Sequence, residues 1–342
     1  MDIREFDYIL PEELIAQTPL EHRDQSRLLV VHKSNSVLEH KRFYNIVDYL
    51  KAGDLLVLND SKVIPARIFG TRAETGGVVE LLLLKQLEQD VWEVLVKPGR
   101  KARVGQVINF GTEMSATVTE ILEDGKRKVH FEHQAETIYE VLDKIGKMPL
   151  PPYITEQLKD GNRYQTVYAR ELGSAAAPTA GLHFTDALLN EIRGKGVRVT
   201  FVTLHVGLGT FRPVKEEKVE NHIMHTEHYE IPEETIRLIK ETKENGGRVV
   251  SVGTTATRTL ESGFDENLNC MSSCGDTSIF IYPGYRFKVI DALITNFHLP
   301  KSTLVMLVSA LAGRDLIMDA YAEAVNEKYR FFSFGDAMLI CE

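Results

Sequence analysis

The sequence predicts an α/β protein in which a small antiparallel β-barrel is inserted into a discontinuous α/β domain. Between residues 66 and about 132, short apolar segments follow one another with only turns between them. On either side of this stretch, strands alternate with helices, which is typical of a mostly parallel α/β sheet or barrel. We therefore expect residues 1–65 and 150–342 to form the α/β domain and residues 66–149 to form the inserted barrel domain.

The barrel segment contains roughly six predicted strands with no helix between them. They are expected at residues 67–70, 78–85, 91–96, 107–110, 116–122 and 128–131. Turn-forming pairs such as Pro98-Gly99 and Asp124-Gly125 separate them. Closely spaced strands of this kind are typical of a small closed barrel. Residues 78–84 are nearly all apolar, so we expect that strand to be buried on both faces.

The α/β segments are predicted in chain order from the apolar runs and the polar residues that end them. Strands are expected at residues 54–58, 197–204, 248–252 and 289–297, and helices at residues 186–193, 256–262 and 303–311. The 342 residues, 43% of them hydrophobic, are enough to bury a sizeable core.

Composition excludes several classes of protein. The formal net charge of −9 disfavours a protein that coats nucleic acid non-specifically. No apolar run is long enough to span a membrane, and the acidic first residues do not resemble a signal peptide. Three sparse cysteines argue against a disulfide framework. We expect a cytoplasmic protein, and a monomer.

The most informative stretch runs from Gly173 to Thr185. Its residues are small until Phe184, so backbone can approach a ligand closely, and Gly181 permits a positive φ. His183 supplies an imidazole, and the hydroxyl of Thr185 is placed to cap the following helix. Close helix packing or a plain loop would explain the small residues equally well, but neither would explain the histidine.

Four further segments place polar residues where a predicted strand ends. In parallel α/β domains ligands bind at the carboxyl ends of strands, near helix N-termini. Thr254 and Thr255 can cap the helix after residues 248–252, and Arg258 could grip a carboxylate unless it pairs with Glu261. The other three segments bring these candidates: Asp60 and Arg67; His205, Gly207, Gly209 and Arg212; His298, Lys301 and Ser302.

The fifth polar segment, residues 222–230, allows two interpretations. His222, His225 and His228 at spacing three could bind zinc if the segment were helical. Residues 226–232 alternate like a strand instead, which would put His228 and Glu230 on one face as an acid–base pair. We expect no metal. The chain also lacks the glycine loops of nucleotide-binding domains and the Gly-x-Ser-x-Gly motif of many hydrolases.

Long ordered motifs resemble a known family, the S-adenosylmethionine:tRNA ribosyltransferase-isomerases of queuosine biosynthesis. The resemblance runs from Met1 to the end of the chain. It is carried by NDSKVIPAR (59–67), APTAGLHFT (177–185), HVGLGTFRPV (205–214), VGTTATRTLE (252–261), ITNFHLPKSTL (294–304) and YRFFSFGDAM (329–338).

The resemblance implies a fold of an α/β-barrel-like domain with a small β-barrel. It also implies a reaction: the ribosyl moiety of S-adenosylmethionine is transferred to 7-aminomethyl-7-deazaguanine at the tRNA wobble position and isomerised. The products are epoxyqueuosine-tRNA, adenine and methionine. The donor is a consumed co-substrate, and no cofactor is expected. S-Adenosylmethionine and tRNA are therefore the implied partners, with no membrane.

Roles follow as hypotheses from the chemistry of this reaction. A base must remove a proton next to the sulfonium, and an acid must protonate the departing adenine. The candidates are His205, His228, Glu230 and His298. Ala177, Pro178, Thr179, Gly181, His183 and Phe184 are expected to contact the adenosine. Arg258, with the N–H groups of Thr254 and Thr255, is expected to hold the methionine carboxylate.

The expected tRNA contacts lie on the barrel. Lys97, Arg100, Lys101 and Arg103 occur within seven residues without an acid, and residues 126–128 form a second basic group. Phosphates could meet these turns while the wobble base leaves its stack to react. Solvated turns are the alternative. A non-catalytic RNA-binding module or a zinc hydrolase would each explain only part of this pattern.

Overall fold

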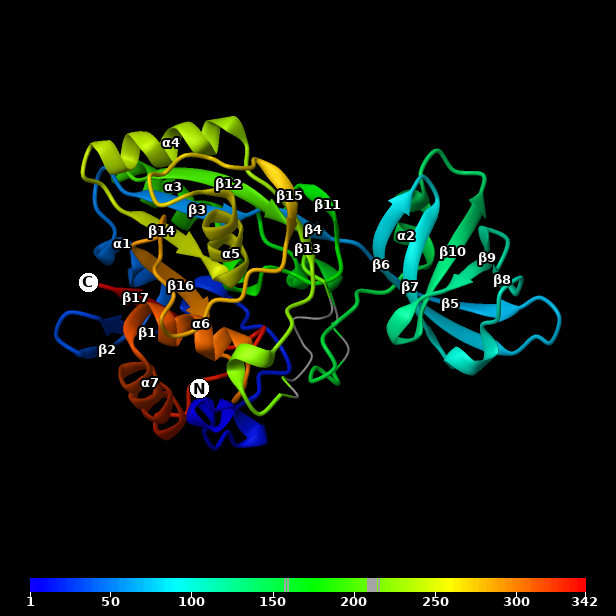
Figure 1. Cartoon of the computed structure of the whole chain (residues 1–342), viewed down its shortest axis with the longest axis horizontal. Coiled ribbons are helices and arrows are strands. Elements are labelled where there is room, and N and C mark those ends of the chain that lie inside the picture. Colours follow the sequence, from blue (N-terminus) through cyan, green and yellow to red (C-terminus); the bar gives the residue numbers. More distant parts are fainter. Residues whose placement is uncertain (157, 159, 208–213, 215) are drawn as a thin grey trace.

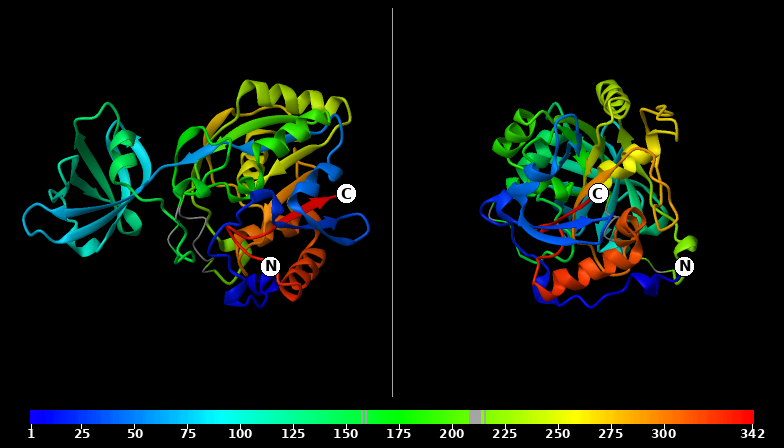
Figure 2. Two further views of the ribbon diagram at one scale, coloured as in Figure 1. Left: turned by 180° about the vertical axis from the view of Figure 1, so that it is seen from behind. Right: turned by 90° about the vertical axis from the view of Figure 1, so that its left-hand side faces the viewer.

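The molecule consists of two lobes. The computed structural model describes every residue except Gln157, Lys159, residues 208–213 and Lys215. The side chains of Lys101 and Asp124 also lie outside the description. Figure 1 shows a large sheet flanked by helices and, beside it, a small barrel joined to it by two chain segments. Figure 2 shows the same two lobes from behind. The predicted fold class, a mixed α/β protein with an antiparallel β-barrel, is confirmed.

The large sheet has nine strands in the order β15-β13-β12-β3-β14-β16-β17-β1-β2. They are β1 (Arg27–His32), β2 (Leu38–Arg42), β3 (Leu55–Asn59), β12 (Arg198–Leu204), β13 (Glu227–Glu230), β14 (Val249–Val252), β15 (Cys274–Thr277), β16 (Ala292–Asn296) and β17 (Ala337–Cys341). Strands β12, β3, β14 and β16 are parallel neighbours, so their carboxyl ends lie at one edge. Strand β17 runs antiparallel to β16 and parallel to β1.

Helices cover both faces of this sheet. They are α1 (Ile46–Tyr49), α3 (Asp186–Gly194), α4 (Glu233–Glu244), α5 (Gly253–Gly263), α6 (Thr303–Ala312) and α7 (Arg314–Asn326). Helices α4 to α7 pack with Leu55 and Val57 in one apolar core, and α1 and α3 pack with Leu56 and Leu58 in another. Because successive side chains of a strand point to opposite faces, one continuous apolar strand supplies both cores.

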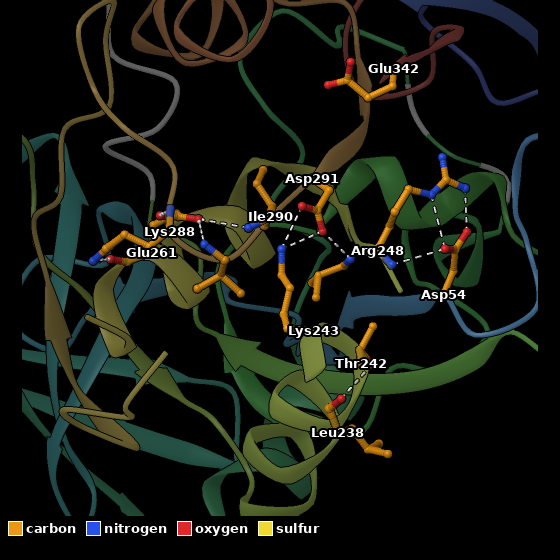
Figure 3. Close-up of polar contacts among 12 residues, drawn as sticks. Asp54, Leu238, Thr242, Lys243, Arg248, Glu261, Lys288, Ile290, Asp291 and Glu342 are labelled. Carbon is orange, nitrogen blue, oxygen red and sulfur yellow. Dashed lines mark hydrogen bonds and ion pairs between the residues drawn. The ribbon is translucent and has the colours of Figure 1, made fainter. Parts of the chain in front are cut away.

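Charged pairs close the amino-terminal edge of the parallel strands, opposite the carboxyl ends. Figure 3 shows Arg248, just before β14, donating to the buried carboxylate of Asp54, just before β3. Lys243 of α4 lies 2.7 Å from both oxygens of Asp291, and Asp291 also accepts the N–H of Val249 at 2.7 Å. These bonds tie the beginnings of three strands together, so this edge serves stability.

The barrel closes in the order β10-β7-β6-β5-β8-β9. Its strands are β5 (Arg67–Arg72), β6 (Val78–Glu88), β7 (Val91–Lys97), β8 (Val107–Phe110), β9 (Met114–Ile121) and β10 (Lys126–His133), and α2 (Ile138–Ile145) packs against its core. All six strands were predicted from turn chemistry. A separate two-stranded ladder joins β4 (Ser61–Val63) to β11 (Glu171–Ser174).

The expectation that residues 78–84 are buried on both faces is wrong. Val79, Leu81 and Leu83 fill the barrel, but Val78 is 67% exposed and Leu82 and Leu84 are only half-buried. A closed barrel has a single interior, so only alternate residues of a strand can reach it. The predicted limits of the two domains, after residues 65 and 149, stay a prediction. No helix among the described residues is long and apolar enough to span a bilayer.

Candidate functional site

A pocket lies at the carboxyl ends of β14 and β16, where helix α5 begins. Its wall is made of Gly253, Thr254 and Thr255 after β14 and of residues 295–299 at the end of β16. Gly253 has φ 86°, a left-handed conformation that lets the chain turn directly from strand into helix. We call this cavity the donor pocket; it is also lined by Tyr153, Ala177, Pro178, Thr179, Ala180, Val206, Ser302, Leu304, Phe332 and Ser333.

Seven residues predicted from the sequence meet in the donor pocket although they come from three distant segments. They are Ala177, Pro178, Thr179, Thr254, Thr255, His298 and Ser302. Ser302 also caps α6, because its hydroxyl accepts the N–H of Val305 at 3.3 Å. Their roles toward a ligand stay a prediction.

The threonines of α5 do not cap their helix, contrary to prediction. Val252 occupies the N-cap position, so Thr254 and Thr255 lie inside the first turn. The hydroxyl of Thr255 is buried, and no hydrogen-bond partner for it exists among the described residues. A buried hydroxyl without a partner loses the hydrogen bonds that it makes to water. The Thr255 hydroxyl and the N–H groups at the start of α5 can therefore form hydrogen bonds with a ligand in the donor pocket.

His298 enters the donor pocket as a neutral imidazole. Burial lowers its pKa to about 3, and its Nε2 lies 3.0 Å from the hydroxyl of Thr295. The backbone N–H of His298 donates to the hydroxyl of Tyr321 at 3.0 Å. The ring is thus held by strand, loop and helix α7, and it can accept a proton or donate a hydrogen bond but carries no charge near neutral pH.

His183 does not line the donor pocket but supports it from behind. Its Nε2 lies 3.0 Å from Oδ1 of Asn296, and its Nδ1 lies 2.7 Å from the hydroxyl of Ser26. Because Asn296 uses its amide nitrogen to donate to the Phe332 carbonyl, its Oδ1 must accept from His183. Burial lowers the pKa of His183 to about 4, which keeps the ring neutral.

Two neighbours of His183 also serve packing. Phe184 is fully buried and meets Phe43 edge to face. Gly181 does not have the positive φ that its residue type allows; instead a Cβ there would lie 2.0 Å from the hydroxyl of Tyr168. Close approach of that tyrosine, and not backbone conformation, requires glycine at this position.

A second cavity, the interlobe groove, lies between the barrel and the large sheet. Its barrel side is lined by Leu84, Lys85, Gln86, Trp92, Glu93, Leu95, Lys126 and Tyr139, and its other side by Leu172, Gly173, His205, Gly207, His225, Thr226, Glu227 and His228. Three predicted residues, His205, Gly207 and His228, are therefore in the groove. Val206 lines the donor pocket, so residues 205–207 form the wall between the two cavities.

His205 is held by the strand beside it. Its backbone N–H donates to the His228 carbonyl at 3.0 Å, and its ring lies against Gly173, where a Cβ would come within 3.3 Å. Burial, together with nearby His228, lowers the pKa of His205. Its Nδ1 is buried without a hydrogen-bond partner in the described part of the chain. A neutral imidazole with a free nitrogen is suited to accept a proton.

His228 and Glu230 lie on one face of β13, as the strand pattern predicted. Their side chains approach to 3.7 Å, and His228 Nδ1 is 2.9 Å from Asp276 on β15. The side chain of Glu230 is 59% exposed and is not part of the groove lining. Residues 222–226 form no helix and β13 begins at Glu227, so the three histidines do not share a helical face; the described residues form no group of three or more potential metal ligands.

Arg258 pairs with Glu227 through Nη1, whereas its Nε and Nη2 are buried without a hydrogen-bond partner among the described residues. Its side chain, 5% exposed, forms a hydrogen-bonded ion pair with Glu227, whose side chain is 1% exposed. Burial would raise the pKa of Glu227, but Arg258 and His225 outweigh it and bring the pKa to about 2. Glu261 instead accepts the N–H groups of residues 288–290. Arg258 does not line the donor pocket, and its predicted grip on a carboxylate there stays a prediction.

Three more predicted residues lie outside both cavities. Asp60 is buried and accepts hydrogen bonds from Thr203 and Arg170, both at 2.7 Å, and its burial raises its pKa. Arg67 pairs with Glu80 on the barrel at 2.9 Å, and Lys301 pairs with Asp7 at 2.9 Å. Their predicted contacts with a substrate stay a prediction. Gly209 and Arg212 lie outside the described residues.

The basic turn after β7 is held from within the barrel. Lys97, Arg100 and Arg103 are exposed there, whereas the side chain of Lys101 lies outside the description. Arg127 is 8% exposed and donates to the carbonyls of Gly99 and Ala102, so it fixes this turn. Its neighbours in the second predicted basic group, Lys126 and Lys128, pair with glutamates. Contact of the turn with tRNA stays a prediction.

Three further residues that line the donor pocket, Tyr153, Phe332 and Ser333, were not predicted as site residues. Tyr153 stacks on Phe332 at 4.6 Å between ring centroids, and its hydroxyl lies 2.6 Å from that of Ser333. Phe332 and Ser333 belong to the motif near the end of the chain, and Tyr153 follows Pro151-Pro152. The only feature of the sequence that could have drawn attention to Tyr153 is its position after two prolines. No local sequence pattern shows that this tyrosine faces β16.

Comparisons with known proteins show the family of this chain. Residues 3–340 match the model of the queuosine biosynthesis protein family. A protein of Acetivibrio thermocellus named S-adenosylmethionine:tRNA ribosyltransferase-isomerase is 59% identical over 99% of this chain and 100% of its own length. The crystal structure of S-adenosylmethionine tRNA ribosyltransferase from Thermotoga maritima is 42% identical, covers 98% of this chain and 99% of its own, and has a TM-score of 0.57. The chain therefore belongs to the queuosine biosynthesis protein family and is an enzyme of the ribosyltransferase-isomerase class.

Proposed function

We propose that this enzyme transfers and isomerises the ribosyl moiety of S-adenosylmethionine onto 7-aminomethyl-7-deazaguanine at the tRNA wobble position. Epoxyqueuosine-tRNA forms, and adenine and methionine leave. The observation that carries the proposal is the position of residues 205–207, which separate the donor pocket from the interlobe groove. A donor nucleoside and an acceptor base can therefore approach one another from two sides of one loop.

The donor pocket suits a nucleoside. Ala177, Pro178 and Thr179 leave room for a planar group beside the stacked rings of Tyr153 and Phe332. The first turn of α5, with the unpartnered hydroxyl of Thr255, supplies hydrogen bonds to a polar ligand atom. Mostly apolar walls with a few fixed polar groups are typical of small-molecule sites.

The interlobe groove suits the acceptor. Lys85 and Lys126 lie on its barrel side, together with the rings of Trp92 on β7 and Tyr139 on α2, which meet edge to face. Cationic and aromatic side chains are what an unstacked nucleotide meets in RNA-binding grooves. We expect the wobble nucleoside to leave its stack and enter here.

Acid–base roles follow from charge. A histidine that removes the proton next to the sulfonium must be neutral, and burial keeps His205 and His298 in that form. His228 lies between the carboxylates of Asp276 and Glu230, the surroundings of a proton donor. We assign proton abstraction to His205, because it lies on the loop between donor and acceptor, and a hydrogen-bonding role to His298.

The test uses the purified enzyme, S-adenosylmethionine and tRNA carrying 7-aminomethyl-7-deazaguanine, without added metal. Chromatography with mass spectrometry measures free adenine and the digested wobble nucleoside. We expect both products in equal amounts, a loss of at least about 100-fold in kcat for His205→Gln, and little change for the control His222→Gln, which lies outside both cavities. Adenine without modified tRNA, or tRNA binding without turnover, would contradict the proposed reaction.

A further inference from the structure

A third cavity, which the proposed reaction does not use, adjoins the donor pocket and contains two arginines. We call it the arginine recess; it is lined by Pro19, Leu20, Arg23, Ser26, Arg163, Leu182, His183, Ser333, Phe334 and Gly335. Ser333 lines both cavities, and His183 of the recess is hydrogen-bonded to Asn296 of the donor pocket. A ligand in the donor pocket therefore lies next to the recess.

The two guanidinium groups are held by backbone carbonyls in a reciprocal arrangement. Arg23 donates to the carbonyls of Gln165 at 2.6 Å and Asn162 at 3.2 Å, and Arg163 donates to those of Glu21 at 3.1 Å and Leu20 at 2.5 Å. Each arginine thus anchors the segment that carries the other. Carbonyl oxygens are neutral acceptors, so these bonds fix both side chains without neutralising their charges.

No carboxylate of the described residues forms an ion pair with Arg23 or Arg163. Asp160, the acid nearest in sequence to Arg163, accepts the N–H of Asn162 at 2.9 Å. Asp336 accepts the N–H groups of Arg27 and Arg330, both at 2.8 Å. Burial and then the charge of Arg163 lower the pKa of Arg23, and the charge of Asp160 offsets only part of this, so the two positive charges repel one another.

Further groups add donors but no negative charge. Arg163 Nε and Arg330 Nη1 are buried and make no hydrogen bond within the described residues. His183 is neutral, because burial first and the nearby Arg330 and Arg23 next lower its pKa. Two fixed positive charges at one partly buried cavity are unfavourable unless an anion joins them, and guanidinium groups match the two oxygens of a carboxylate or phosphate.

We propose that the arginine recess is a binding site for an oxyanion, held by Arg23 and Arg163 beside the donor pocket. Given the proposed function, the oxyanion is either the methionine carboxylate of the donor, in place of the role first predicted for Arg258, or a backbone phosphate of the bound tRNA. Both bring a pair of negative oxygens to the same guanidinium groups, and binding measurements separate them.

The experiment compares Arg23→Gln and Arg163→Gln with Arg23→Lys and Arg163→Lys, using Arg193→Gln on the exposed side of α3 as control. Binding of S-adenosylmethionine is measured by calorimetry and binding of tRNA by fluorescence anisotropy. We expect each Gln variant to weaken the binding of one of the two ligands by a factor on the order of 10 to 100. The Lys variants keep the charge but lose the fork, so their affinity should lie between that of the Gln variants and that of the unaltered enzyme.

Inorganic phosphate at constant ionic strength serves as an independent probe. It should raise the midpoint of thermal unfolding of the unaltered enzyme and of Arg193→Gln more than that of the two Gln variants. Loss of donor affinity identifies the carboxylate, and loss of tRNA affinity identifies the phosphate. Unchanged affinity for both ligands, or Lys variants as impaired as Gln variants, would overturn the inference. These are binding measurements, so they remain decisive even if the enzyme fails to produce epoxyqueuosine-tRNA.

Discussion

The Nε2 atom of His183 lies 3.0 Å from Oδ1 of Asn296, a residue 113 positions later in the chain. This bond joins the 3₁₀ helix Thr179–His183 to the end of β16 and fixes the Asn296 amide at the donor pocket. His183, which the sequence indicated as a ligand contact, thus acts on the pocket through Asn296. Removing it would leave a buried amide oxygen without its donor, which typically costs about 1–3 kcal/mol.

The two neutral buried histidines, His183 and His298, should make the free energy of unfolding depend on pH. His183 has a folded-state pKa of about 4 and His298 one of about 3, both below the value of 6.5 for an exposed histidine. Below pH 6.5 the unfolded chain takes up protons that the folded chain refuses, so the free energy of unfolding falls as pH falls. Each histidine contributes a slope of up to about 1.4 kcal/mol per pH unit down to its folded-state pKa.

Denaturant unfolding between pH 7.5 and 5 measures this slope. His183→Gln should lower stability at pH 7.5 but reduce the slope by up to one proton, since glutamine does not titrate. His130→Gln, which replaces an exposed residue on β10, is the control and should leave the slope unchanged. An equal slope in His183→Gln and the unaltered enzyme would mean that His183 is protonated in the folded state.

Thr255→Val should separate ligand binding from stability. The Thr255 hydroxyl is buried without a partner among the described residues, so removing it should leave the unfolding midpoint unchanged or higher. Affinity for S-adenosylmethionine should fall about 10-fold if the ligand accepts or donates one hydrogen bond there.

Thr257→Val is the matched variant, two residues further along the same helix. Its hydroxyl is bonded to Ser251 at 3.0 Å and to the Gly253 carbonyl at 3.2 Å, so this variant should lose stability. Differential scanning fluorimetry and calorimetric titration give both quantities. A loss of stability in Thr255→Val with unaltered donor affinity would show that the hydroxyl has only a structural role.

Local sequence predicted the caps of α3 and α6 but not that of α5, and the difference has a physical cause. Thr185 and Ser302 each precede a helix and accept an N–H three residues later, a relationship that the sequence contains in full. Thr254 and Thr255 have the same side-chain chemistry. They fall inside α5 because Gly253, at a φ of 86°, already turns the chain into the helix.

The strand ends that form the donor pocket were predictable because parallel strands share an edge, whereas side-chain partners were not. Arg258 was expected to pair with Glu261 or to bind a ligand, but it pairs with Glu227, 31 positions away on strand β13. Tyr153 reaches Ser333 across 180 positions. Helix and strand periodicity fixes which face a residue occupies, but the residue opposite is set by tertiary packing.

The basic turn of the barrel yields a prediction about RNA. Replacing both Arg100 and Lys101 with Glu should weaken tRNA binding. It should also reduce the salt dependence of binding, because fewer counterions are released when tRNA binds. Binding of S-adenosylmethionine should not change, since Arg100 lines neither the donor pocket nor the interlobe groove. Arg193→Glu on α3 is the control for net charge. Unaltered tRNA affinity at moderate salt would mean that the turn is only solvated.

The charged pairs at the amino-terminal edge of the sheet should affect stability alone. Asp54 is 3% exposed and accepts hydrogen bonds from the side chain of Arg248 and from the N–H of Lys51. Asp54→Asn removes the charge that holds Arg248, which should cost about 1–3 kcal/mol. The kcat and KM of the remaining folded enzyme should be unchanged at 25 °C, because the groups to which we assign the reaction lie at the opposite ends of the strands. A change in KM for the donor would contradict this division of the sheet.

The buried pair of Arg258 and Glu227 yields the last prediction, and it needs two variants because either change alone is ambiguous. Arg258→Met leaves the Glu227 carboxylate without its principal partner, so we expect a loss of about 3–5 kcal/mol in the free energy of unfolding. Arg258→Met combined with Glu227→Leu removes both charges and should recover much of that loss. A role in holding the donor carboxylate predicts the reverse: donor affinity would fall in both variants alike, however stable the double variant is. Unfolding in denaturant and donor titration of the same two proteins therefore decide whether Arg258 holds the protein or the ligand.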